Sequence, residues 1–222
     1  MLEAILFDFD GVLADTMQDN LRAWRAVLGK RGISFPPEEY FLLEGMKMTE
    51  VARRLTQSHG VLEADYESIV VEKDGYYKEN NTFRLYPGVR ELLGALRLKG
   101  TRLALVTAGR LPRLQASCPP DFLAMFEVVI TGDKTERGKP FPDPYLAASK
   151  ALGVAADSCL VIENAPLGID SAKGAGMRCV AITSTLSEDK LARADWVISG
   201  IKELAWTPPL INIFHDYNKN AI

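Results

Sequence analysis

Two carboxylates stand two residues apart where a buried strand is expected to end. Asp8 and Asp10 follow the apolar run 4–7, which is short and bounded as a buried strand should be. An extended backbone sends residues i and i+2 to the same side, so the two acids would share one face. Burying both would require a cation or bound protons to offset their charge. The alternative interpretation is a strand-end turn with two solvated aspartates.

Polar residues also mark the ends of the other expected strands. In a parallel sheet these ends meet at one edge, so the side chains there should lie close together. Each has an ordinary interpretation when taken alone: a strand end, a solvated loop lysine or an acid that caps a helix. Their joint occurrence with the aspartate pair indicates a common site. They are Thr107, Lys139, Glu163 and Asn164.

The elements that must position these side chains follow two patterns. Residues from about 15 to 82 show helical spacing and no strand signal. From residue 85 onward, helices alternate with short apolar runs rich in β-branched residues, which predicts a parallel sheet with crossover helices on both faces. The expected strands are 4–7, 102–107, 128–131, 158–163, 178–183 and 196–199. The fold class is therefore α/β and Rossmann-like, with a helical cap inserted after the first strand.

The helical segment is predicted to form a domain of its own. Residues 15–82 would be the cap, and 1–14 together with 83–222 would be the α/β core. The two ends of the insertion should lie close together, because both join the core. Ligands of open α/β sheets bind beyond the carboxyl ends of the strands. The cap leaves from that edge, so it should sit over the site.

Composition narrows the class of protein. The 222 residues are 47% hydrophobic and 25% charged, as in a soluble globular protein. A net charge of -3 gives no electrostatic footprint for nucleic acid, and no apolar stretch is long enough to span a membrane. Three scattered cysteines fit reduced thiols, and no signal peptide is visible, so we expect a cytoplasmic protein. We also expect a monomer or weak homodimer, with the apolar tail after Trp206 docked on the core.

Four motifs occur in order along the chain. They are Asp-x-Asp-Gly-Val-Leu-x-Asp-Thr at 8–16, Thr-Ala-Gly at 107–109, Gly-Lys-Pro-x-Pro-x-Pro at 138–144 and Glu-Asn-x-x-x-Gly at 163–168. With them, the sequence closely resembles the haloacid dehalogenase superfamily, and within it the β-phosphoglucomutase-like phosphatases. The resemblance covers nearly the whole chain to about Glu203. It implies phosphoryl transfer through an aspartyl-phosphate, with Mg²⁺ as the cofactor.

The resemblance implies a role for each matched residue. Asp8 would be the nucleophile, and Asp10 the acid that protonates the leaving alkoxide and then the base that activates water. Lys139 would neutralise the nucleophile and a phosphate oxygen as a point charge. Thr107 and the backbone N–H of Ala108 would hydrogen-bond the phosphate oxygens. Mg²⁺ would bridge the carboxylate and the phosphate dianion, whose like charges repel each other.

The implied metal ligands include one departure from the family pattern. They are Asp8, Asp10, Glu163 and Asn164. Many relatives carry an acid at the position of Asn164, whose amide oxygen can ligate Mg²⁺ but supplies no charge. Glu163 would then matter more, directly or through a water. We expect Asn164→Asp to tighten Mg²⁺ binding; an unchanged metal dependence of the rate would count against Asn164 as a ligand.

The positions that would contact substrate also depart from a mutase pattern. β-Phosphoglucomutases carry a cap arginine after a glycine turn and a cap histidine. Here the matching stretch is 44–49, in which a methionine occupies the arginine position, and Asn20 stands at the histidine position. Lys47 is either a substitute charge for a distal phosphate or a solvated lysine. Lys73 lies on an apolar helical stripe, and the preferred interpretation is a stem on that face with its ammonium group in water. The candidate substrate-binding residues are Thr16, Asn20, Lys47, Lys73, Ala108 and Gly109.

The leading hypothesis is a Mg²⁺-dependent phosphatase of a small phosphorylated metabolite, similar to a sugar phosphate, with cap closure excluding bulk water. The alternative is a β-phosphoglucomutase-type phosphosugar mutase. A non-catalytic phosphate-binding module would not need two acids facing a phosphate. A dehalogenase is disfavoured, because that branch of the family would lack the second aspartate, and Asp10 is present.

Overall fold

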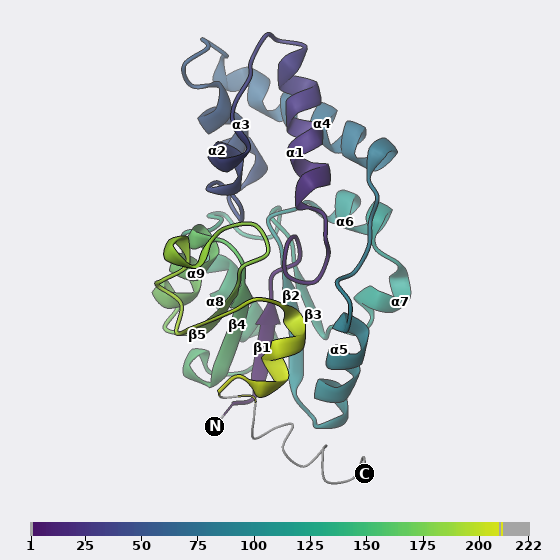
Figure 1. Ribbon diagram of the computed structural model, residues 1–222, viewed down its shortest axis with the longest axis vertical. Coiled ribbons are helices and arrows are strands. Elements are labelled where there is room, and N and C mark those ends of the chain that lie inside the picture. The colour runs from purple at the N-terminus through teal and green to yellow at the C-terminus, as the bar shows by residue number, and fades with distance from the viewer. Residues whose placement is uncertain (1, 209, 211–222) are drawn as a thin grey trace.

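The core of the protein is a six-stranded sheet in which every strand pair is parallel. A computed structural model describes residues 2–208 and 210. The strand order is β3-β2-β1-β4-β5-β6, which confirms the predicted α/β, Rossmann-like class (Figure 1). The strands are β1 (Ala4–Phe7), β2 (Arg102–Val106), β3 (Val128–Ile130), β4 (Cys159–Glu163), β5 (Arg178–Ile182) and β6 (Trp196–Ile198).

The register of the central strands brings their carboxyl ends together. Phe7, the last residue of β1, pairs with Leu105 of β2 and with Ile162 of β4. Asp8, Thr107 and Glu163 therefore stand at or just beyond three adjacent strand ends. This is the convergence that the sequence predicts, and it follows from parallel pairing around β1.

Helices cover both faces of the sheet, as expected. Alternate residues of each strand point to opposite faces. Accordingly, Ile5 and Phe7 pack in the core with α5, α6 and α7, whereas Ala4 and Leu6 pack with α8 and α9. The helices are α5 (Val89–Leu98), α6 (Leu111–Ser117), α7 (Pro120–Leu123), α8 (Asp143–Leu152) and α9 (Pro166–Gly174), with short 3₁₀ turns η2 (Ala156–Ser158), η3 (Glu188–Lys190) and η4 (Ile201–Trp206).

The helices α6 and α7 are absent from the sequence-based prediction. Both are short, and prolines stand in the first turn of each. A segment of this length spans too few turns for an apolar period to show. The omission matters, because α6 carries a residue of the candidate site.

The segment of residues 15–82, between β1 and α5, forms helices joined by turns and contains no strand, as predicted, and it stands beyond the carboxyl ends of the strands (Figure 1). It contains α1 (Met17–Gly29), α2 (Pro37–Phe41), α3 (Met48–Thr56), η1 (Glu63–Asp65) and α4 (Tyr66–Asn80). Its ends lie side by side, since Ala14 bridges Leu85 and the N–H of Asp15 donates to the carbonyl of Arg84 at 2.9 Å. The division into 15–82 and the remainder as separate domains stays a prediction.

Lys73 corrects one expectation. Its side chain is fully buried, at 0% exposure, and its ammonium group donates to Oδ1 of Asn20 at 2.7 Å. The group does not reach water because α4 packs against α1, which places Trp24 and Tyr77 within 6 Å of Nζ, at 5.9 and 5.2 Å from the ring centroids. Burial, and then the charge of Arg113, lower the pKa of Lys73 to about 8.

Lys73→Met is expected to stabilise the protein at pH 7, by about 1–3 kcal/mol. The pKa of Lys73 is about 8 in the fold against an ordinary 10.5, so the fold disfavours its charged form. Between these values the unfolded chain keeps a proton that the folded chain releases. The free energy of unfolding of the parent therefore rises with pH across this window, by up to about 1.4 kcal/mol per pH unit. The free energy of unfolding of Lys73→Met should not rise with pH in this way.

Urea unfolding at pH 7 and pH 10 measures this difference. The advantage of Lys73→Met should be present at pH 7 and should shrink at pH 10. Lys78→Met, on the exposed side of the same helix, is the control. Its stability relative to the parent should be the same at pH 7 and pH 10. If the stability of Lys73→Met relative to the parent increased with pH, the lowered pKa of Lys73 would be contradicted.

Two further expectations concern the termini and membranes. Leu210 is fully buried in the core, but most of the tail expected to dock there lies outside the described residues. Within the described part of the chain, none of the helices combines the length and apolar character needed to cross a bilayer.

Candidate active site

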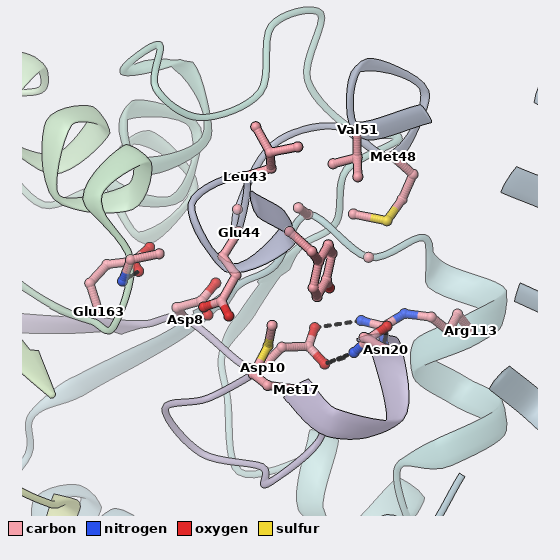
Figure 2. A pocket seen from close by; sticks show the side chains of 15 residues that line it. Asp8, Asp10, Met17, Asn20, Leu43, Glu44, Met48, Val51, Arg113 and Glu163 are labelled. Atoms are coloured by element: carbon pink, nitrogen blue, oxygen red, sulfur yellow. Dashed lines mark hydrogen bonds and ion pairs between the residues drawn. The ribbon is translucent and has the colours of Figure 1, made fainter. Parts of the chain in front are cut away.

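A small cavity lies between the strand ends and the helical insertion. Its volume is about 30 Å³, roughly the space of one water molecule. Both parts of the chain contribute side chains, which Figure 2 shows converging on the cavity. Those lining it are Asp8, Asp10, Met17, Asn20, Tyr40, Leu43, Glu44, Gly45, Met48, Val51, Ala108, Gly109, Arg113, Glu163 and Ala165.

Lys139 joins two carboxylates at the floor of this site. Its Nζ donates to Oδ1 of Asp8 and to Oε1 of Glu163, each at 2.6 Å. All three side chains are buried. Burial raises the pKa of Asp8 to about 7, although the charge of Lys139 acts to lower it. Although burial acts against it, the two carboxylates raise the pKa of Lys139 above its ordinary value, so this residue keeps its proton.

Glu163 is held by four donors. Oε1 also accepts from the hydroxyl of Tyr145 at 2.6 Å, and Oε2 accepts from the backbone N–H groups of Asn164 and Ala165 at 3.0 and 3.3 Å. Gly168 leaves the space for this carboxylate, because a Cβ at that position would lie 1.8 Å from Oε1. The Glu-Asn-x-x-x-Gly motif therefore needs a glycine at its last position, because a side chain there would overlap the carboxylate of Glu163.

Gly168→Ala is expected to destabilise the protein by about 1–3 kcal/mol. The new methyl group would overlap a carboxylate that four hydrogen bonds prevent from moving away. Thermal denaturation measures the effect. Gly174→Ala, at the end of the same helix, is the matched control, since its Cβ would meet nothing closer than 3.7 Å. Equal melting temperatures for the two variants would contradict the steric role of Gly168.

Asp10 is paired with Arg113, which the sequence analysis missed. The guanidinium donates to Oδ2 at 2.5 Å and to Oδ1 at 3.2 Å, and Figure 2 shows Arg113 facing Asp10. Oδ1 also accepts from Thr16 at 2.6 Å and from Asn20 at 3.2 Å. Although burial acts to raise it, the charge of Arg113 lowers the pKa of Asp10. Thr16, predicted as a substrate-binding residue, stands at the start of α1, and its hydroxyl bonds Asp10 and does not cap the helix.

Glu44 is the second residue that the sequence analysis missed. It lies in the turn between α2 and α3 and is buried, at 5% exposure. Its Oε2 accepts from Nδ2 of Asn164 at 2.7 Å and from Oγ1 of Thr185 at 3.2 Å. Burial and the neighbouring charge of Asp8 raise the pKa of Glu44 well above its ordinary value. None of the four motifs in the sequence includes Glu44, so no spacing singles it out.

The expected phosphate loop borders the cavity. Ala108 and Gly109 line it, and the buried hydroxyl of Thr107 accepts a hydrogen bond from the N–H of Gly109 at 3.0 Å. Lys47 lies elsewhere: its ammonium group donates to the backbone carbonyls of Thr135 and Glu136, and it does not line the cavity. Lys47 therefore ties the insertion to the loop that precedes Lys139.

The comparisons with known proteins agree with this geometry. A family model described as haloacid dehalogenase-like hydrolase matches residues 5–182. The chain belongs to the haloacid dehalogenase-like hydrolase family. Hexitol phosphatase A of Escherichia coli (strain K12) is 30% identical to this hydrolase, over 92% of this chain and 94% of its own. The expected resemblance and enzyme class, a phosphoric monoester hydrolase of this family, are confirmed.

Solved structures share the fold of this hydrolase. CbbY from Rhodobacter sphaeroides, in complex with phosphate, is 29% identical with a TM-score of 0.77, covering 92% of this chain and 96% of that one. A β-phosphoglucomutase from Clostridium difficile is 25% identical with a TM-score of 0.82, covering 99% and 100%.

The donor set of this hydrolase fits a hard divalent cation. Among residues 2–208 and 210, no three His, Cys, Asp or Glu side chains form a ready-made metal cage. Mg²⁺ does not need one, since it keeps several waters and uses one or two carboxylates together with substrate phosphate. Lys139 bonds the carboxylates of Asp8 and Glu163, and the buried carboxyl group of Glu44 lies close enough to Asp8 for their charges to interact. With all three carboxyl groups ionised, two negative charges are left over, which one Mg²⁺ would balance.

Proposed function

We propose that this hydrolase is a Mg²⁺-dependent phosphatase that acts on a small, sugar-phosphate-like metabolite through an aspartyl-phosphate on Asp8. The contact that carries the proposal is the 2.6 Å hydrogen bond from Lys139 to Asp8 at the carboxyl edge of the sheet. A lysine that only stabilised the fold would not need to hold a carboxylate that borders a cavity. The named relative that hydrolyses hexitol phosphates supports the substrate class.

The proposed reaction has two steps. An Asp8 oxygen attacks phosphorus, the bond from phosphorus to the ester oxygen breaks, and Asp10 gives its proton to the leaving alkoxide. Water then attacks phosphorus, Asp10 takes its proton, and the bond to Asp8 breaks to release inorganic phosphate. Thr107 and the N–H of Ala108 would hold the phosphate oxygens as charge develops. Lys139 would keep Asp8 ionised and oriented.

A bound Mg²⁺ would offset the repulsion between carboxylate and phosphate, held by Asp8 and Asp10 with Glu163 and Asn164 as predicted ligands. Glu163 accepts from four donors and thereby also positions Lys139 and the loop of Asn164. Direct or water-mediated ligation by Glu163 stays a prediction.

Arg113 favours one of the two protonation states that Asp10 needs. With its pKa lowered by Arg113, Asp10 is ionised, which suits the base that activates water. The acid step requires a protonated Asp10, so the ion pair must loosen when substrate enters. The volume of about 30 Å³ is also too small for a sugar phosphate, so entry requires the insertion 15–82 to move as a cap.

One observation favours the mutase as a second candidate. Lys73 and Arg113 place two buried cationic groups around Asn20, beside Asp10, where a distal phosphate would find positive charge. The 25% identical β-phosphoglucomutase shares the fold. Against it, Lys47 is committed to backbone carbonyls.

A single assay separates the two functions. The protein is incubated with Mg²⁺, β-glucose 1-phosphate and glucose 1,6-bisphosphate. Accumulation of free phosphate supports the phosphatase, and accumulation of glucose 6-phosphate supports the mutase. A panel of sugar and polyol phosphates, nucleotides and phosphorylated acids then identifies the substrate. Gel filtration tests the proposed monomer or weak homodimer, and a cytoplasmic location is proposed with it.

A further inference from the structure

We propose that Glu44 is a ligand of the divalent cation, directly or through one water, and that the helical insertion thereby completes the metal site. This inference rests on the proposed function, which requires a cation at Asp8. Its consequence is that cation binding and docking of the insertion are linked. The missing charge at Asn164 is supplied from the other side of the cavity.

Glu44 is aimed into the cavity and has an unused oxygen. Figure 2 shows its side chain descending from the loop of the insertion toward Asp8. It is 95% buried, and within the described residues its Oε1 has no hydrogen-bond partner. A buried carboxylate oxygen without a donor is costly, so such an oxygen beside a metal site calls for a cation or a proton.

Carboxylates outnumber cationic groups beside Asp8, but not beside Asp10. Asp10 is neutralised by Arg113. Asp8 and Glu163 share the single ammonium group of Lys139. Among the described residues, the donors to Glu44 are neutral: the amide of Asn164 and the hydroxyl of Thr185. The deficit of two positive charges therefore exists only when Glu44 is counted with the site.

Asn164 and Glu44 form a matched pair. The Asn164 amide donates to the Glu44 carboxylate at 2.7 Å. An acid at 164 would face Glu44 with like charge, whereas the amide holds it in place. Position 164 supplies no charge at the sheet edge, and the insertion brings the carboxylate of Glu44 to it.

The loop of Glu44 is docked on the loop of Lys139. Gly45 has φ +82°, and a Cβ there would lie 2.8 Å from Cδ of Lys139. Two residues later, Lys47 bonds the carbonyls of Thr135 and Glu136. Because the backbone that follows Glu44 rests on the core, moving the insertion away would withdraw this ligand. Cation binding should then favour the docked arrangement.

The direct test measures Mn²⁺ binding, without substrate, from the electron paramagnetic resonance signal of free Mn²⁺. Glu44→Gln keeps the acceptor for Asn164 but removes the charge, and is expected to weaken Mn²⁺ affinity by about ten- to a hundredfold. Glu39→Gln is the matched control, an exposed acid on neighbouring α2. Circular dichroism verifies that each variant is folded.

A second variant and a second readout separate ligation from general damage. Glu44→Gln combined with Asn164→Asp is expected to recover affinity, because the acid returns to the sheet edge. In hydrogen exchange, Mn²⁺ should protect amides of 42–47 in the parent and not in Glu44→Gln.

Each outcome has a definite meaning. Parental affinity in Glu44→Gln, with Asp8→Asn weakened, would overturn the role of Glu44 and leave the proposed function standing. Absence of Mn²⁺ and Mg²⁺ binding by the parent would overturn both. Weak binding by Glu44→Gln that Asn164→Asp does not recover, with no change in exchange at 42–47, would also count against ligation.

Discussion

Asp8→Asn is expected to abolish phosphatase turnover while leaving the protein folded. The substitution keeps the size of a side chain that is 6% exposed and removes the nucleophilic oxygen that Lys139 contacts at 2.6 Å. Loss of a nucleophile lowers turnover by about 10⁴-fold or more. The measurement is release of inorganic phosphate from the best substrate of the panel, with saturating Mg²⁺.

The control for Asp8→Asn is Asp157→Asn. Asp157 is exposed on η2, which precedes β4 and so lies at the opposite end of the sheet. Its replacement should leave turnover unchanged. Hydrolysis by Asp8→Asn at the parental rate would remove Asp8 from the reaction.

Lys139→Met is expected to reduce both stability and activity strongly. Its ammonium group is the only cation among the described residues bonded to Asp8 and to Glu163, both of them buried. Removing one partner of a buried ion pair costs about 3–5 kcal/mol, because charge remains uncompensated. For a chain of this size, that corresponds to a fall in melting temperature of roughly 10 °C. Turnover should fall as well, by about 10³-fold, since the nucleophile loses its orienting charge.

Lys134→Met is the control for Lys139→Met. Lys134 lies in the same loop, is exposed, and donates only to the carbonyl of Val129. It should retain stability and turnover. A folded Lys139→Met with parental stability would mean that the two carboxylates are neutral without the lysine, contrary to the proposed charge balance.

Most of the fold was predictable because the signals are local. The six strands are short apolar runs, and the strand ends differ from prediction by one residue at most. The long segment of helical spacing likewise predicts an insertion, and Asp8, Lys139 and Glu163 meet because parallel strands share one edge. The short, proline-flanked α6 was missed because it spans too few turns to show a period.

The remainder of the site depends on pairings across long stretches of chain. Arg113 meets Asp10 across 103 residues, and Glu44 meets Asn164 across 120. Neither residue type is unusual in its local segment, so no spacing distinguishes it. Lys73 was expected in water because a lysine on an apolar stripe usually extends beyond it; here α1 covers the whole side chain.

The central claim is that phosphate passes through a covalent bond to Asp8. The most direct measurement is acid quenching during steady turnover of the preferred substrate, followed by mass spectrometry of proteolytic peptides. The account predicts the added mass of one phosphoryl group on the peptide containing Asp8, absent in Asp8→Asn. A phosphoryl group located on any other residue, or turnover by the parent with no adduct at any quench time, would contradict it.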